Sequence, residues 1–559
     1  MEQRNAEASL YRQILDDADR HYPDLGVQQL VGDTDALALF SSDASVPGVF
    51  TRQAWEGRVR QAINEIAEAR REEIDWVLSD KPAEIGPRLN PDHLREQLTE
   101  RYFQDYAGAW LDLLNSLHWR KPGSLDEVID QLTLMSDARH SPLIALLNSV
   151  TYQGQAGAGD QALTDSQVKS AQTLIGQFIG QDKTALIDPL VQLPGGPLDA
   201  TFGPLLALVS TDPENRRGAD SMSLSSYLNQ VTRVRLKLEQ VRSAPDPLDM
   251  TLALAQTVFQ GHSIDLTDTQ TYAGLMAASL GSEWHTAAQT LFVKPLDNAW
   301  QQVLRPSAAG INRQWQRSIV SHWNDAFTSR YPFASTASDA SLPMLGQMIR
   351  ADSGRIEQFL QRQLNGVVRK EGNRWVADSR HSQGLRLNPQ FLTAINQLSD
   401  IADVLYTDGG MGLSFELQGK GVRDVVQTTF ILNGTKHHYF NQKESWQRFT
   451  WPGGSEYPGV SLTWTSVHAG ERLFGDYQGT WGLIRLLEKA RATPLDDGDS
   501  RYRLVLKAPD GLNLTWYLRT ELDAGPLALL KLRGFRLPQQ IFLGEGAAQD
   551  SYAENGSFQ

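Results

Sequence analysis

The chain has 559 residues, which is too long for one compact core and predicts several domains. Its formal net charge of -14 argues against a nucleic-acid-binding protein, because such a protein needs a basic face to release counterions from phosphate. The sequence contains no cysteine, which excludes disulfides, thiolate metal sites and cysteine nucleophiles together.

The first 23 residues have no apolar core of the kind that a signal peptide carries. No stretch of the sequence approaches the run of about 20 apolar residues that a membrane-spanning helix needs. If the chain were complete, these two observations would predict a soluble cytoplasmic protein, for example a helical adaptor.

The first three-fifths of the chain has helical periodicity. Asn90 and Pro91 supply an N-cap and a proline at the first helical position. Ser124 and Glu127 form a capping box, because the hydroxyl and the carboxylate can each bind an orphan backbone donor. Apolar residues at spacings of three and four predict amphipathic helices. The apolar stripes are Leu94, Leu98, Tyr102, Tyr106, Trp110, Leu113 and Leu117; Leu143, Leu146, Leu147 and Val150; and Leu224, Leu228, Val231, Val234, Leu238 and Val241.

An ordered hinge is predicted at residues 330–333. Tyr331 precedes Pro332, and proline disfavours helical backbone at the residue before it, so the preceding helix should end there. Tyr331 and Phe333 are large apolar residues that should be buried. The preceding helix carries Trp315, Ile319, Trp323 and Phe327.

Beyond residue 405 the hydrophobic period changes from about 3.6 to 2. Asn433 and Gly434 separate two strand-like runs and predict a hairpin, because both residues accept positive φ. One helix, beginning near Trp481, interrupts the strands. Strands without βαβ alternation predict an antiparallel sandwich. The alternating sets are Leu413, Phe415 and Leu417; Val460, Leu462 and Trp464; Tyr502, Leu504 and Leu506; and Leu514, Trp516 and Leu518.

The predicted fold class is therefore α+β multidomain, with long helical subdomains followed by a C-terminal antiparallel β-sandwich. The glycine-rich segment 153–160 is predicted to be a flexible linker or loop. The expected parts are helical subdomains at 1–152, 161–328 and 329–404, a sandwich at 405–543 and a disordered tail at 544–559.

A search for chemistry assigns no catalytic, cofactor-binding or metal-binding residue. The glycines and lysine of 412–421 have the wrong spacing for a phosphate-binding loop and lack its hydroxyl ligand, so a strand ending in a tight turn is expected. His437 and His438 are adjacent on a predicted strand and point to opposite faces, so they cannot chelate one metal and are expected at the surface. The acidic run 496–499 lacks the ligand spacing of a calcium loop.

Tryptophan is enriched in the predicted sandwich. Trp464 and Trp516 share their strand parity with apolar neighbours and are predicted to lie in the core. The tryptophans of this region are Trp446, Trp451, Trp464, Trp481 and Trp516.

Trp451 differs because it falls in a proline- and glycine-rich segment, 449–459, with Tyr457 nearby. Exposed loop aromatics are enriched at binding interfaces. Trp451, Pro452, Tyr457 and Pro458 are therefore candidate partner-binding residues. The alternative is that the loop folds back and Trp451 closes the end of the sandwich.

Several short strings recur in an order and spacing that resemble one family, the IcmF/TssM proteins, which are inner-membrane core components of type VI secretion systems. Together they extend from residue 46 to residue 538. They are Val46-Pro-Gly-Val-Phe-Thr-Arg52, Asp75-Trp-Val-Leu78, Tyr102-Phe-Gln-Asp-Tyr106 with Trp110, Ser141-Pro-Leu143, Arg330-Tyr-Pro-Phe333 with Asp339-Ala340, Trp451-Pro-Gly453, Gly479-Thr-Trp481 with Arg485-Leu-Leu487, and Gly534-Phe-Arg-Leu-Pro538.

The resemblance implies a structural scaffold that is not an enzyme and needs no cofactor. It implies the periplasmic segment of an inner-membrane protein, with the membrane anchor and an NTPase-like domain outside this chain and a C2-like sandwich at its C-terminal end. The implied partners are an outer-membrane lipoprotein (TssJ-like), an inner-membrane protein (TssL-like) that binds parts outside this chain, and further copies in a ring, with no nucleic acid.

We expect the lipoprotein to bind the sandwich through the loop 449–459, and we expect the turns at 433–435 and 496–499 to lie at the opposite end. The main alternative function is a glycan-binding or glycan-cleaving periplasmic protein, because tryptophan-rich sandwiches bind sugars. A glycosidase would need two carboxylates facing each other across a cleft at less than about 10 Å.

Overall fold

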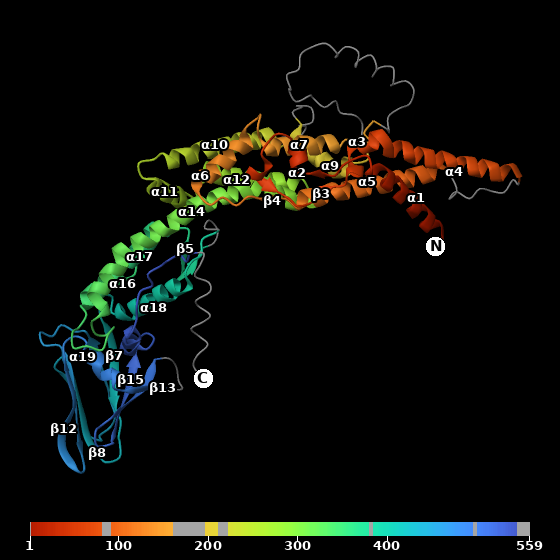
Figure 1. Ribbon diagram of the computed structural model, residues 1–559. Coiled ribbons are helices and arrows are strands. Elements are labelled where there is room, and N and C mark those ends of the chain that lie inside the picture. Colours follow the sequence, from red (N-terminus) through yellow and green to blue (C-terminus); the bar gives the residue numbers. More distant parts are fainter. Residues whose placement is uncertain are drawn as a thin grey trace. The chain divides into compact units, whose positions relative to one another are not determined.

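The structure is a computed structural model that describes residues 2–80, 91–159, 196–210, 222–378, 384–495 and 500–544 (Figure 1). It divides into two compact units, one of residues 1–250 and 263–303, the other of residues 251–262 and 304–559. The predicted order of helical subdomains followed by an antiparallel sandwich is confirmed. The finer division of the helical part stays a prediction. Among the described helices, none is long and apolar enough to cross a membrane.

The first unit is built from helices. α4 packs along α5, and α10 packs against α6 and α12 (Figure 1). Two short strand pairs join loops to this bundle, β1 (Leu25–Gly26) with β3 (Ser45–Val46) and β2 (Phe40–Ser41) with β4 (His118–Trp119). The helices are α1 (Glu2–Asp19), α2 (Val27–Val31), α3 (Arg52–Ala54), α4 (Arg60–Asp80), α5 (Pro91–Asn115), α6 (Leu125–Ser136), α7 (Pro142–Gln153), α9 (Asp199–Val209), α10 (Leu224–Arg242), α12 (Asp265–Ser279) and α13 (His285–Ala288).

The aromatic stripe of α5 is buried, as its spacing predicts. Each polar tip finds a backbone acceptor. Tyr102 donates to the carbonyl of Val49 at 2.6 Å, Tyr106 to that of Gln153 at 2.7 Å, and Trp110 to that of Phe50 at 2.8 Å. Large amphipathic rings can lie in a core only when their polar ends are bonded, so these contacts fix two distant segments to α5.

The predicted flexible linker at 153–160 is ordered where the structure describes it. Gln153 and Ala156 are buried, and residues 154–159 form consecutive turns. Gly157 has φ of +77°, and a Cβ there would approach the Phe103 ring to 2.7 Å. The glycines of this segment therefore allow tight turns against the core, and residue 160 lies outside the described residues.

The second unit combines helices, one hairpin and the sandwich. α11 (Pro247–Phe259) and α14 (Lys294–Trp315) each contain a boundary between the units. The helix of α14 continues through η8 (Gln316–Val320), α15 (Ser321–Trp323) and η9 (Asn324–Thr328). The other elements before the sandwich are α16 (Leu342–Ile349), α17 (Arg355–Gln363), β5 (Val368–Glu371), β6 (Arg374–Ala377) and α18 (Pro389–Leu405).

The predicted end of the helix before Pro332 and the predicted burial of Tyr331 and Phe333 are confirmed, while the role of this segment as a hinge stays a prediction. The helical segment ends at Thr328, Tyr331 is extended and forms an isolated bridge with Asp339, and the Tyr331 and Phe333 side chains are buried. Phe333 joins a cluster around Trp323, whose ring centroid lies 5.5 Å from that of Phe333 and 5.7 Å from that of Phe535. The cluster therefore ties the hinge to a segment that follows the last strand of the sandwich.

The sandwich consists of two antiparallel sheets (Figure 1). One has the strand order β10-β7-β15-β14-β13 and the other β12-β11-β8-β9. Leucine and aromatic side chains from both inner faces meet α19, which packs against β11, β12 and η10. The elements are β7 (Leu413–Gly419), β8 (Val425–Leu432), β9 (Thr435–Tyr439), β10 (Trp446–Trp451), β11 (Gly459–Ser466), β12 (Ala469–Gln478), α19 (Gly482–Glu488), β13 (Arg491–Pro494), β14 (Arg501–Lys507), β15 (Asn513–Thr520) and η10 (Gly525–Leu532).

Most strand predictions are confirmed, including the hairpin turn, where φ is +51° at Asn433 and +83° at Gly434. Trp464 and Trp516 are each 2% exposed and lie in the core as predicted. The segment 446–451 is a strand paired with β7 rather than the start of a loop. Its period-2 alternation of Phe449 and Trp451 was masked in the sequence by the prolines and glycines that follow.

We expect Trp323→Ala to lower the free energy of unfolding of the second unit by about 3–5 kcal/mol, because it empties the centre of the aromatic cluster. Urea unfolding followed by circular dichroism measures this. The control is Leu473→Ala, which removes a side chain that is 58% exposed and should change stability by less than about 0.5 kcal/mol. Equal effects of the two substitutions would show that the cluster does not hold this unit together.

Candidate functional site

Trp451 is the last residue of β10, and its side chain is only 1% exposed. Its indole Nε1 donates to the carbonyl of Thr480 at 2.7 Å, and its ring centroid lies 5.5 Å from that of Trp481. The alternative in which Trp451 closes the end of the sandwich is therefore correct. The expectation that Trp451 is an exposed loop residue was wrong, because the register of β10 turns its side chain into the core.

The loop 452–458 that follows is held at both ends. Asn433 donates through Nδ2 to the carbonyl of Pro452 at 2.7 Å and accepts at Oδ1 from the backbone N–H of Gly459 at 3.0 Å. The N–H of Gly479 donates to the carbonyl of Pro458 at 2.8 Å. The side chain of Asn433 thus joins the two ends of the loop, and we call its two hydrogen bonds the clamp. Sequence reasoning identified Asn433 only as a turn residue.

Tyr457 is the exposed aromatic residue of this loop. Its side chain is 85% exposed, whereas Pro452 and Pro458 are half-buried at the two held ends. Proline restricts φ, so the loop loses less conformational entropy on docking than a free loop would. Of the candidate residues, Tyr457 is the most exposed, and Pro452 and Pro458 lie on either side of it at the held ends of the loop.

The turn at 433–435 lies at the same end of the sandwich as this loop, not at the opposite end as expected. The bonds of Asn433 to Pro452 and Gly459 require it. The expectation overlooked that β8 ends beside the start of β11, where Leu432 pairs with Val460. The other expected turn, 496–499, lies outside the described residues.

Trp481 joins the same end of the sandwich to the segment between the hinge and α16. Its indole, which is fully buried, donates to the carbonyl of Ala340 at 2.7 Å. Trp451 and Trp481 therefore form a pair of rings whose N–H groups bind two different backbone segments. Both belong to short strings that carried the family resemblance.

Tyr331 completes this joint. The guanidinium of Arg485 lies 3.7 Å from its ring centroid and that of Arg533 lies 5.3 Å from it. Arg485 also forms an ion pair with Asp339, and Arg533 forms one with Glu488. The Tyr331 hydroxyl donates to Glu488 at 3.1 Å, and burial together with this carboxylate raises the pKa of Tyr331. Cation–π contacts of this kind stabilise most where water is excluded.

The two adjacent histidines point to opposite faces, as predicted. His438 is half-buried, and its Nδ1 lies 2.7 Å from Thr429 Oγ1. His437 is not a surface residue: it is 6% exposed, packs on Trp516 and has its Nδ1 2.6 Å from Gln447 Oε1. In the described part of the chain, no group of three or more histidine, aspartate or glutamate residues could hold a metal ion.

We expect Asn433→Gly to loosen the loop without straining the turn, because glycine accepts positive φ but removes both clamp bonds. At about 0.5–1.5 kcal/mol for each bond, cleavage by a glutamate-specific protease after Glu456 should accelerate by roughly tenfold. Limited proteolysis with mass spectrometry checks this. An unchanged cleavage rate in a folded variant would mean that Asn433 does not hold the loop.

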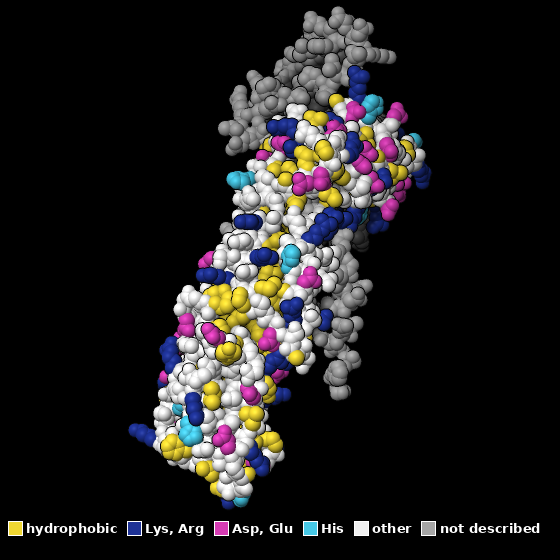
Figure 2. All heavy atoms as spheres, turned by 90° about the vertical axis from the view of Figure 1, so that its left-hand side faces the viewer, with side chains coloured by type: hydrophobic (Ala, Val, Ile, Leu, Met, Phe, Trp, Pro, Cys, Tyr) yellow, Lys and Arg dark blue, Asp and Glu magenta, His cyan; other side chains and the backbone are white. Residues whose placement is uncertain are grey.

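Acidic and basic side chains are interspersed over the face of the molecule shown in Figure 2, without one continuous basic field.

Three family models match the chain. They are described as the type VI secretion protein IcmF helical domain, over residues 306–411, the type VI secretion protein IcmF C2-like domain, over residues 415–522, and an IcmF-related family named for intracellular multiplication and human macrophage-killing, over residues 1–155. The curated relative "Type VI secretion system component TssM1" of Pseudomonas aeruginosa is 25% identical over 483 residues. That match covers 84% of this chain and 42% of the relative's length.

Two solved structures match nearly the whole chain. A chain of a "Type VI secretion system membrane core complex" is 44% identical, with a TM-score of 0.73, and the match covers 96% of this chain and 99% of that one. A chain of a "Type VI membrane complex" is 43% identical, with a TM-score of 0.74, and the match covers 97% of this chain and 100% of that one. The chain belongs to the IcmF/TssM family of type VI secretion proteins.

Proposed function

We propose that this chain is a structural scaffold segment of a type VI secretion membrane core complex in the bacterial cell envelope, and that it is not an enzyme. The observation that carries the proposal is the 44% identity, over nearly the full length of both chains, to a chain of a membrane core complex. The chain spans less than half the length of its curated relative. In line with the family resemblance, we propose that this segment lies in the periplasm. We also propose that the inner-membrane partner binds parts of the protein outside this segment.

The placement of the tryptophans favours a scaffold over a glycan-binding protein. Trp451, Trp464, Trp481 and Trp516 are each at most 2% exposed and cannot stack on a sugar. The guanidinium of Arg519 lies 4.5 Å from the ring centroid of the remaining one, Trp446. Four of the five tryptophans that suggested sugar binding are therefore core residues, and Arg519 lies over the ring of the fifth.

The outer-membrane lipoprotein is proposed to dock on the sandwich at Tyr457. The loop that carries Tyr457 is held at both ends by Asn433, and it follows directly after Trp451, whose buried ring lies against that of Trp481. An exposed tyrosine on a rigid base offers a large contact area at a low entropic cost. Such residues are typical hot spots at protein interfaces.

We expect Tyr457→Ala to weaken lipoprotein binding by roughly tenfold or more, as removal of an aromatic hot spot does. The thermal transition of the free chain should not change, since the side chain is 85% exposed. Calorimetric titration with the lipoprotein and a melting curve on the same preparation provide the two measurements.

Two variants serve as controls. Phe440→Ala removes another exposed aromatic side chain, 54% exposed, from the far end of β9 and should leave affinity unchanged. Trp451→Ala should lower stability by about 3–5 kcal/mol, affecting binding only through unfolding. Full affinity in a folded Tyr457→Ala chain would remove this loop from the interface.

A further inference from the structure

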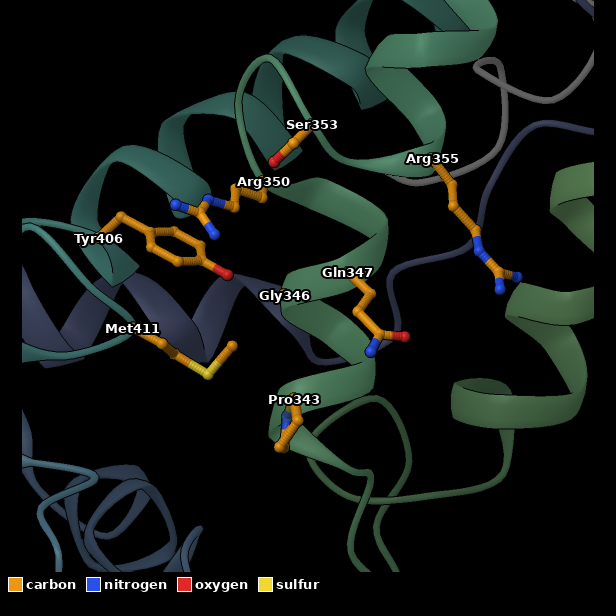
Figure 3. Close-up of a pocket in the computed structure, with 8 residues that line it drawn as sticks. All are labelled: Pro343, Gly346, Gln347, Arg350, Ser353, Arg355, Tyr406 and Met411. Carbon is orange, nitrogen blue, oxygen red and sulfur yellow. The ribbon is translucent and has the colours of Figure 1, made fainter.

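A groove runs along both sides of α16 in the second unit. On one side a cavity of about 490 Å³ is lined by α16, Arg350, Tyr406 and Met411 (Figure 3). On the other side a cavity of about 390 Å³ lies between α16 and the helical segment that ends at Thr328. The two cavities share Gln347 and Arg355 as lining residues. We call the two cavities together the α16 groove.

The floor of the first cavity depends on Gly346. A Cβ at this position would lie 2.1 Å from the terminal carbon of Met411 and 2.4 Å from the Tyr406 hydroxyl. Glycine therefore lets both side chains approach α16, as Figure 3 shows. Met344 is 47% exposed and adds an apolar, adaptable surface to the second cavity.

The lining of the α16 groove is positively charged, whereas the chain as a whole has a net negative charge. Arg330, Arg350 and Arg355 line it, whereas Asp325 is the carboxylate among its described lining residues. The Arg350 guanidinium lies 5.2 Å from the Tyr406 ring centroid, and none of the three arginines has an ion-pair partner in the described part of the chain. Three arginines and a single carboxylate give the α16 groove a positive charge in a chain whose net charge is -14, and this charge favours an acidic occupant.

The first unit carries a segment with the complementary chemistry. Asp33 and Asp35 are exposed and have no ion pair in the described residues, and Leu37 beside them is 67% exposed. The turn is rigid, because Gln28 Nε2 donates to the carbonyls of Gly32 and Thr34, each at 2.9 Å. We call residues 33–37 the acidic turn. It presents two carboxylates and one large apolar side chain in a fixed arrangement.

We propose that the α16 groove of one copy of this chain binds the acidic turn of a second copy. Leu37 would contact the apolar floor at Met411, while Asp33 and Asp35 pair with Arg350 and Arg355, which line the same cavity. Because the two surfaces differ, the contact is heterologous and can be repeated from copy to copy in a closed ring. This inference rests on the proposed scaffold role in a membrane core complex and names the surfaces through which copies of the chain would associate.

A charge-reversal exchange tests the pairing on the full chain. One variant carries Arg350→Glu with Arg355→Glu, and the other carries Asp33→Lys with Asp35→Lys. Each alone should self-associate at least about tenfold more weakly than the unchanged chain, since like charges then face each other. An equimolar mixture should recover association, because each groove then meets a turn of opposite charge. Sedimentation velocity over a concentration series measures all three.

The control carries Arg362→Glu with Arg503→Glu, which makes the same change in net charge at exposed arginines outside the groove. It should associate like the unchanged chain. Arg350→Gln with Arg355→Gln should give a smaller loss, and circular dichroism confirms folding of every variant.

Association of both reversed variants at the unchanged strength, or failure of the mixture to recover it, would overturn the proposal. So would a groove variant that loses lipoprotein binding while its self-association is intact, because the groove would then serve another partner. The lipoprotein titration of Tyr457→Ala is independent of these results. Failure of the copy-to-copy contact can therefore be told apart from failure of the docking function.

Discussion

The arrangement at the end of the sandwich depends on two buried indole N–H groups that each find a backbone acceptor, whereas the buried indoles of Trp323 and Trp516 in the same unit have none among the described residues. Trp451 and Trp481 donate to the carbonyls of Thr480 and Ala340. An unpaired buried donor costs about 1–3 kcal/mol, so the acceptor segments cannot move without a penalty. Because Ala340 lies between the hinge and α16, the Trp481 bond fixes the sandwich to the segment that precedes it. The Trp451 bond holds the end of β10 to Thr480, which precedes α19 within the sandwich.

The joint is also polar at its rim. Tyr331 lies between two guanidinium groups that each pair with a carboxylate, Arg485 with Asp339 and Arg533 with Glu488. Partly buried and hydrogen-bonded, this network specifies one orientation more strongly than apolar packing alone. In the proposed scaffold role, such a joint would hold the sandwich and the segment before it in one arrangement.

The sequence predicts the elements far better than it predicts the site. Periodicity and capping residues identified α5, α6, α7 and α10 and most strands, because each of these signals is local. Trp451 could not be placed, because its burial depends on a pairing between β10 and β7, which are about thirty residues apart in the chain. The clamp by Asn433 was missed for the same reason: the Asn-Gly turn is a local signal, whereas its bonds to Pro452 and Gly459 are set by tertiary structure.

The central claim is that the end of the sandwich beneath Tyr457 is a rigid joint held by two indole N–H bonds. Hydrogen exchange of the tryptophan indoles, measured by NMR on the folded chain, tests it most directly. The account predicts that the indole protons of Trp451 and Trp481 exchange as slowly as the most protected core amides of the second unit. Fast exchange of either indole while those amides stay protected would show that the joint opens locally, and it would contradict the account.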